Sequence, residues 1–173
     1  MNTSSVTDAS AKARQLRSRF GYKLPLNVTG LVENHGITII KREVERSVTG
    51  VLVVDSTLVT MLLNRSFDVS QQRFSTAHLF GHFVLHGNLS SLFVDFLRPN
   101  ENRATHQSRR QWEQEADEFA DELLMPEEIL RVSISHRPHN MRSSNVVQPL
   151  AARFGVSELA FVLRLSQLGL MNY

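Results

Sequence analysis

His78-Leu79-Phe80-Gly81-His82 places two histidines four positions apart within an apolar part of the sequence. If this stretch is helical, the two side chains lie on one face, about one turn apart, so that both imidazoles can reach the same ion. The five residues have the frame of the His-Glu-x-x-His motif of zinc hydrolases, but Leu79 stands at the position of the glutamate. A leucine cannot take a proton from water or pass it to a leaving amine. The stretch therefore predicts a metal site without its usual general base.

A helix is predicted over residues 69–86, with Gly87 as its C-terminal cap. At about 100° per residue, the two motif histidines and His86 project from one face, and Leu79 is expected beside the metal. Most other side chains of this segment are apolar, which is typical of a helix buried in a core. Gly81 lacks a side chain, so we expect another element to approach the helix closely there. His86 either makes a hydrogen bond behind the metal ligands or helps to end the helix.

The third metal ligand is expected on a second long helix, over residues 108–124. The apolar side chains of this helix define one buried arc, and Glu113 falls within that arc. A carboxylate on a core face needs a partner, and zinc held by His78 and His82 would provide it, with a fourth position left open. Asp117, four residues after Glu113, is placed to accept the outward N–H of a ligand histidine. Three further glutamates are expected outside the arc: Glu115, Glu118 and Glu122.

Two alternatives stay open for these residues. The histidines of a core helix can instead be satisfied by neighbouring carbonyl groups, with no metal bound. Two histidines and a carboxylate with open positions also suit iron(II) as well as zinc. The chain has no cysteine, so thiolate ligands are excluded and any metal must be held by histidine and carboxylate.

The rest of the sequence predicts a single α+β domain that spans residues 1–173. A helix is expected near the N-terminus, within 1–24, and a pair of helices at the other end, within 145–173. Pro25 is expected to open a short helix, and residues 88–107 are expected to form a loop. Three short apolar runs indicate a small three-stranded antiparallel sheet packed on the helical region: 37–40, 51–54 and 58–63.

Composition and charge narrow the classes of partner. The net charge is +2, and no apolar stretch approaches the roughly 18 residues needed to span a bilayer. We therefore expect a cytoplasmic protein without a membrane partner. Residues 150–157 and the leucine-rich segment after them have the spacing of a helix-turn-helix, but that segment carries only one basic side chain, Arg164. Direct binding of nucleic acid is not expected, because phosphate contacts normally need several basic side chains.

Three segments carry a pattern that extends beyond the histidine pair: Ala77-His78-Leu79-Phe80-Gly81-His82, Glu113-Gln114-Glu115-Ala116-Asp117-Glu118-Phe119-Ala120 and Leu123-Leu124-Met125-Pro126. They resemble the ImmA/IrrE family of metallopeptidases, whose members carry Ala-His-Glu-x-Gly-His, Glu-x-x-Ala-(Asn/Asp)-x-Phe-Ala and Leu-Leu-Met-Pro. The resemblance implies a gluzincin-like fold with zinc on His78, His82 and Glu113. The family is typically bacterial or carried on phages and mobile elements, and its active members cut helix-turn-helix repressors. The resemblance therefore implies such a repressor as the partner.

Leu79 departs from the pattern of that family at one functional position. General acid–base catalysis is typically worth about 10² to 10⁴ in rate, so we expect weak peptidase activity at most. A carboxylate from residues 88–107 would be able to substitute, but no spacing in the sequence identifies one. Two functions stay open. The chain is a weak zinc peptidase that acts on a repressor, or it is a catalytically inactive protein-binding module, a pseudo-protease. By analogy with the family, a toxin–antitoxin component that regulates a repressor partner is a further form of the second alternative.

Overall fold

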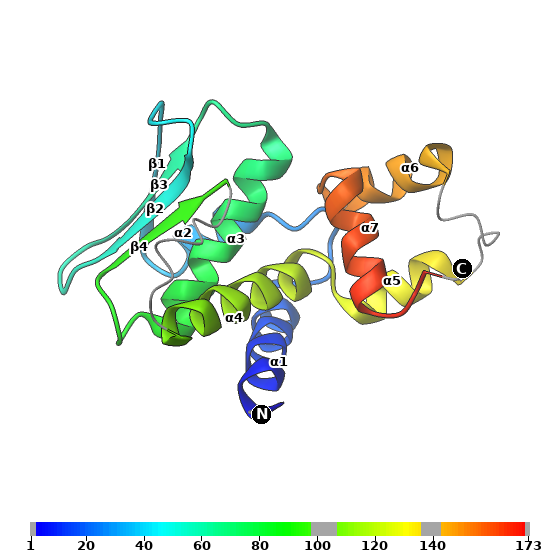
Figure 1. The fold of residues 1–173 in the computed structure, drawn as a ribbon, viewed down its shortest axis with the longest axis horizontal. Coiled ribbons are helices and arrows are strands. Elements are labelled where there is room, and N and C mark those ends of the chain that lie inside the picture. The colour runs from blue at the N-terminus through cyan, green and yellow to red at the C-terminus, as the bar shows by residue number, and fades with distance from the viewer. Residues whose placement is uncertain (1–2, 98–106, 136–142, 172–173) are drawn as a thin grey trace.

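The computed structural model describes residues 3–97, 107–135 and 143–171, which form an α+β fold (Figure 1). The α+β class predicted from the sequence is confirmed. The strands in this part of the chain are β1 (Ile37–Arg42), β2 (Val48–Val54), β3 (Val59–Asn64) and β4 (Leu92–Phe96). Its helices are α1 (Thr3–Phe20), α2 (Val28–Glu33), α3 (Val69–His86), α4 (Gln107–Leu124), α5 (Glu127–Ile134), α6 (Ser144–Phe154) and α7 (Glu158–Gln167).

The strands form one mixed sheet in the order β1-β3-β2-β4. Strand β3 pairs with β2 in antiparallel fashion but with β1 in parallel, so that Ile37 lies beside Val59. The prediction of a three-stranded antiparallel sheet was therefore wrong in two respects, the direction of β1 and the presence of β4. Apolar periodicity locates strands but does not reveal their partners, so the parallel pair does not follow from it.

Strand β4 lies in the segment that the sequence predicts as a loop. It has only five residues, and one of them is the charged Asp95, so its alternation is too short to distinguish it from a loop. The part of the predicted loop from residue 98 to 106 lies outside the described residues. The correction matters for function, because β4 packs against α3.

Helix α3 lies in the middle of the fold, with the sheet on one side and α4 on the other (Figure 1). Its predicted bounds and its cap at Gly87 are confirmed. Asp68 caps the first turn by accepting from the backbone N–H of Gln71, and the N–H of Gly87 donates to the carbonyl oxygen of Phe83. Because elements pack on both sides of α3, its residues from Ser75 to His82 are all buried. The two motif histidines are thereby held in the core.

Gly81 allows α3 and α4 to approach each other closely. A Cβ atom at this position would lie 3.0 Å from Cδ1 of Phe119 and 3.2 Å from Cα of Ala116. These distances are shorter than normal van der Waals contact, so a side chain here would push the two helices apart. The close approach predicted at Gly81 is confirmed, and it brings the ligand-bearing part of α4 opposite the histidines of α3.

The ends of the described chain are helical, as predicted. Helix α1 packs on α4, where Ser10 Oγ donates to Glu118 Oε1 at 2.7 Å. Helices α6 and α7 form the predicted C-terminal pair, and Arg73 of α3 holds the turn between them by donating from Nε to the carbonyl oxygen of Gly155 at 2.9 Å. Among the described residues, no single helix is long and apolar enough to cross a membrane, and α6 with α7 meet that test only as a pair bent by 92°.

Two helix boundaries near prolines differ from the expectation. The short helix predicted to open at Pro25 instead begins at Val28, because the side chain of Asn27 caps it by accepting from the N–H of Gly30. Helix α4 ends before Pro126 as expected, but that proline is also the N-terminal cap of α5, a helix that the sequence did not predict. A proline can precede a new helix as well as follow an old one, because the missing N–H of a residue before or at the helix start leaves no intrahelical hydrogen bond unmade.

Candidate metal centre

Three side chains from two helices converge on one point between α3 and α4. The Nε2 atoms of His78 and His82 are 3.1 Å apart. The carboxylate of Glu113 on α4 lies 3.3 Å from Nε2 of His78 and 3.6 Å from Nε2 of His82. In a tetrahedral zinc site with bonds of about 2.0–2.2 Å, neighbouring ligand atoms are about 3.3 Å apart. The distance to His78 is measured from Oε2 of Glu113 and that to His82 from Oε1, so the two nitrogens and the carboxylate are spaced as ligands of one zinc ion are.

The outward nitrogen of His78 is held by a carboxylate. Its Nδ1 lies 2.8 Å from Oδ1 of Asp117, the residue that the sequence suggested for this position. An ionised carboxylate only accepts hydrogen bonds, so Nδ1 carries the proton of the neutral ring. The lone pair is then on Nε2, which faces Glu113. Carboxylates that orient ligand histidines in this way are common around zinc.

His82 is oriented by a longer chain of hydrogen bonds that ends at a second carboxylate. Its Nδ1 is 3.2 Å from Nδ1 of His86, and Nε2 of His86 is 2.8 Å from Oε2 of Glu115. Because Glu115 accepts, Nε2 of His86 donates to it and Nδ1 of His86 accepts from Nδ1 of His82. The lone pair of His82 is therefore also on Nε2. Of the two roles open to His86, the structure shows it in hydrogen bonds behind the ligands.

When both rings are neutral, these hydrogen bonds leave three acceptors facing one another with no donor between them. Nε2 of His78, Nε2 of His82 and the carboxylate of Glu113 all present lone pairs to the same point. Three converging lone pairs in a largely buried place repel one another unless a cation lies between them. The donor set therefore fits a divalent metal, with neutral imidazoles and an ionised carboxylate as ligands.

The electrostatic surroundings of the same groups favour one positive charge at the centre. Burial lowers the pKa of His78, but hydrogen bonds to Asp117 and Glu113 and the negative charges of Asp95 and Asp117 outweigh it and raise the pKa well above its ordinary value. Burial raises the pKa of Glu113, yet the two neighbouring imidazoles, when protonated, bring it far below its usual range. Without a metal ion, a proton on His78 would occupy the centre. Burial and the charge of His78 lower the pKa of His82, so two protons are not held there.

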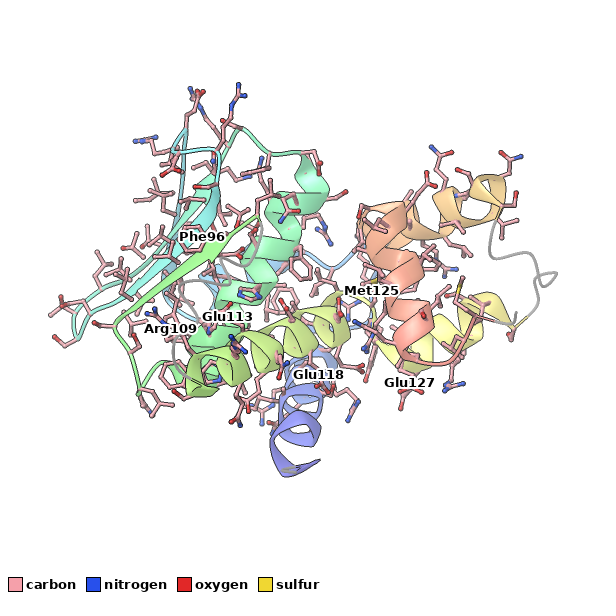
Figure 2. The ribbon with its side chains drawn as sticks, in the orientation of Figure 1. Phe96, Arg109, Glu113, Glu118, Met125 and Glu127 are labelled. Carbon is pink, nitrogen blue, oxygen red and sulfur yellow. The ribbon has the colours of Figure 1, made fainter. Side chains whose placement is uncertain are left out.

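One wall of the site is open to solvent. The side chains of His78 and His82 are 3% and 2% exposed, whereas those of Glu113 and Asp117 are 49% and 58% exposed. The sequence predicted Glu113 within the buried arc of α4, and this prediction was wrong, because its side chain is half exposed. Figure 2 shows it on α4 where that helix passes α3. The exposed side of this carboxylate gives an ion or a substrate access to the centre.

The buried face of α4 is different from the one that apolar periodicity defines. Glu115 and Glu122 were expected outside this face, but they are 9% and 2% exposed. Helix α4 packs against both α3 and α1, so its covered surface is wider than a single arc. Glu115 is buried beside His86, and Glu122 is buried beside Arg164 and Arg14. A helical projection that assumes one packing neighbour predicts one buried face, so it does not predict these buried pairs of charged and polar side chains.

Leu79 occupies the position of the missing glutamate as part of the apolar core. Its side chain is fully buried, and a Cβ atom at Gly50 of β2 would lie 2.8 Å from Leu79 Cδ1. The leucine therefore packs against the sheet. On the neighbouring strand, the ring of Phe93 stacks on His82 with centroids 4.6 Å apart. This contact does not follow from the sequence, because the pattern around Phe93 predicts a loop.

The chain matches the family model of the IrrE N-terminal-like domain, a peptidase family, over residues 32–166. This range includes the sheet and all of α3 and α4, and so every side chain of the centre. No curated protein matches the chain.

Proposed function

Because the chain belongs to the IrrE N-terminal-like family of metallopeptidases, we propose that it binds zinc and an extended segment of a helix-turn-helix repressor, which it hydrolyses weakly. The observation that carries the proposal is the convergence of His78 Nε2, His82 Nε2 and the Glu113 carboxylate within 3.1–3.6 Å. When bound, zinc would lower the pKa of water in the site and polarise the carbonyl group of a peptide. The repressor as partner rests on the resemblance to the family.

The protein supplies orientation and access. Asp117 and the His86–Glu115 pair hold the imidazole rings of His78 and His82 with their lone pairs inward. The exposed side of Glu113 leaves room for a substrate beside the ligands. Such preorganised ligands need no rearrangement when an ion or a peptide arrives.

The edge strand β4 supports an extended segment as the bound form of the partner. Within the described part of the chain, β4 pairs with β2 alone, so its other edge has no strand beside it. Extended peptides commonly bind by adding to such an edge. The stacking of Phe93 on His82 places this edge next to the metal centre. Leu92 and Leu97 are each 50% exposed and offer apolar contacts to a peptide there.

A second candidate function is binding of the repressor without cleavage. The observation that favours it is Leu79, which is fully buried in the core and holds no proton at the position of the family glutamate. In this case the same ligands and the same edge would dock the partner. Both functions predict the same complex with the repressor, and they differ only in whether the bound repressor is cleaved.

The experiment that tests the proposal uses purified protein with a panel of helix-turn-helix repressor domains, with zinc and with chelator. Mass spectrometry detects cleavage, and fluorescence anisotropy detects binding. Zinc-dependent cleavage that is lost in Glu113→Gln supports the peptidase, with the exposed Glu128→Gln as the matched control. Binding without cleavage supports the second candidate. Neither binding nor cleavage across the panel would contradict both.

A further inference from the structure

The metal centre lacks a carboxylate where the family motif has one, but the neighbouring strand brings one to the same place. In the register of β2 and β4, Asp95 is the cross-strand partner of Gly50. Directly paired residues of an antiparallel pair carry their side chains on the same face of the sheet. A Cβ atom at Gly50 would point at Leu79, 2.8 Å from its Cδ1 atom. Asp95 therefore leaves the sheet on the face that packs against Leu79.

A second contact fixes the position of Asp95 along α3. Phe93 lies two residues before Asp95, so both side chains share one face of β4. The ring of Phe93 stacks on His82, with an angle of 22° between the planes, and lies 6.5 Å from His86. The next position on this face, Asp95, therefore lies beside the preceding turn of α3. Figure 1 shows β4 running alongside α3, and that turn carries His78 and Leu79.

The carboxylate of Asp95 has an oxygen free for another group. Its Oδ2 atom is buried and has no hydrogen-bond partner among the residues that the structure describes. A buried carboxylate oxygen without a partner destabilises the fold, so its presence needs an explanation. The other carboxylates of the centre are engaged by its histidines: Glu113 and Asp117 by His78, and Glu115 by His86.

Asp95 acts on the centre without belonging to its ligands. Burial lowers the pKa of His78, and the charge of Asp95 is one of the influences that oppose burial and raise it. The carboxylate is therefore close enough to interact with the ligand electrostatically. It is not in the group of ligand atoms, all within 4.8 Å of one another, that His78, His82 and Glu113 form. This position suits a group that contacts a molecule beside the metal.

We propose that Asp95 supplies the proton-accepting carboxylate that Leu79 lacks, so that the catalytic residue for peptide hydrolysis has moved from the helix to the facing strand. This inference rests on the proposed function. Asp95 takes one proton from the attacking water, whose oxygen forms a bond to the carbonyl carbon of the peptide. The bond from that carbon to the amide nitrogen then breaks, and Asp95 passes the proton to the departing amine. One water is consumed, and a carboxyl and an amino terminus are formed.

The test uses full-length protein loaded with Co²⁺, whose visible absorption reports on ligands at the metal, and two probes with different demands. Acetohydroxamic acid binds metals as an anion, and a nearby carboxylate favours it by taking up its proton. Thiocyanate binds as an anion and has no proton to give. The variants are Asp95→Asn and Asp95→Glu, with Glu43→Gln as the control, because Glu43 is an exposed carboxylate that pairs with Arg65 and not with a side chain of the metal centre.

We expect Asp95→Asn to lose affinity for acetohydroxamic acid but not for thiocyanate. Asp95→Asn should bind acetohydroxamic acid about 10- to 100-fold more weakly, which corresponds to one charge-assisted hydrogen bond. Thiocyanate should bind as tightly as before or more tightly, because a negative charge has been removed. Asp95→Glu should restore most of the acetohydroxamic acid affinity, and Glu43→Gln should behave like the unmodified protein. If Asp95→Asn fails to fold by circular dichroism, Asp95→Ser takes its place with the same expectations.

Three outcomes would overturn the assignment, and they are distinguishable. Unchanged acetohydroxamic acid binding in the Asn variant would show that Asp95 takes no proton at the metal, while the proposed function stands. Equal weakening of both probes would show that Asp95 only maintains the shape of the site. Failure of the unmodified protein to bind Co²⁺ would contradict the proposed function itself, and the role of Asp95 with it.

Discussion

At the scale of single residues, the substitution that sets this chain apart is a leucine packed in the core. Leu79 is fully buried and lies against the glycine of β2 at position 50. We predict that Leu79→Glu lowers the free energy of unfolding of the zinc-free protein by about 2–4 kcal/mol, because it buries a carboxylate without a partner. Leu79→Met should cost less than about 1.5 kcal/mol. Urea denaturation of both variants in the presence of chelator measures the difference.

The same variant separates the two candidate functions. If zinc-dependent cleavage appears only in Leu79→Glu, the natural chain is a binding module and Asp95 does not replace the missing base. If the natural chain cleaves a repressor and loses that activity in Asp95→Asn, the strand carboxylate is sufficient. A zinc-free Leu79→Glu protein with the same free energy of unfolding as the unmodified chain would contradict the packing described for this position.

Asp121 on α4 makes stability depend on pH. Burial raises its pKa to about 6, although Arg164 opposes the shift. Between about pH 4 and 6 the folded state holds a proton that the unfolded state releases, so the contribution of Asp121 to stability is full below pH 4 and is lost as the pH rises through 6. We predict that Asp121→Asn stabilises the protein by up to about 3 kcal/mol at pH 8 and by little at pH 4. Thermal or urea unfolding across this pH range provides the measurement.

Asp55 provides a control of opposite sign for that experiment. Hydrogen bonds from the backbone N–H and the hydroxyl of Thr57 lower the pKa of this exposed carboxylate. Its ionised form is favoured in the folded state, so Asp55→Asn should be less stable than the unmodified protein at neutral pH. In acid, where the carboxylate is protonated, the two proteins should be equally stable. A gain at pH 8 for Asp55→Asn, or none for Asp121→Asn, would mean that these environments are described incorrectly.

At the scale of elements, the contact between α3 and α4 determines the geometry of the centre. A Cβ atom at Gly81 would meet Phe119 at 3.0 Å and the backbone of Ala116 at 3.2 Å. We predict that Gly81→Ala lowers the free energy of unfolding by about 1–3 kcal/mol through overpacking. It should also weaken zinc binding, because α4 carries Glu113 and would be displaced from the histidines. Denaturation and zinc titration measure the two effects, and unaltered values for both would rule out a tight contact.

Some elements could be predicted from the sequence, and others depend on contacts distant in the chain. Helix α3 has local end signals, a capping Asp68 and a following Gly87, and its predicted bounds agree with the structure. The parallel pairing of β1 with β3 and the strand β4 depend on neighbours that no local pattern names. The set His78, His82 and Glu113 came from motif and resemblance, and the structure brings the three together. Asp95 was missed because strand register alone places it there.

At the scale of the whole molecule, a metal at this centre would join helices that are distant in the sequence. It would link α3, which packs on the sheet, to α4, which packs on α1. A ligand that binds only the folded state stabilises it by about 2.7 kcal/mol at a concentration 100 times its Kd. For a chain of this size, about 1 kcal/mol shifts Tm by roughly 2–4 °C.

We therefore predict that saturating zinc raises Tm by about 5–10 °C, because the free energy of binding adds to that of folding. Differential scanning calorimetry with zinc and with chelator provides the measurement. Glu113→Gln should reduce the shift, whereas Glu128→Gln on the exposed side of α5 should preserve it. An equal shift in both variants would assign the effect to zinc bound elsewhere on the surface.

The measurement that tests the central claim most directly is the metal content of protein purified without chelator or added metal. We predict close to one equivalent of zinc per chain, lost in the His78→Ala, His82→Ala double variant, because these rings present two of the three lone pairs at the centre. Elemental analysis by mass spectrometry gives both values. If the natural chain holds no metal, or if the double variant still holds one equivalent of zinc per chain, the claim that these side chains form a metal centre would be contradicted.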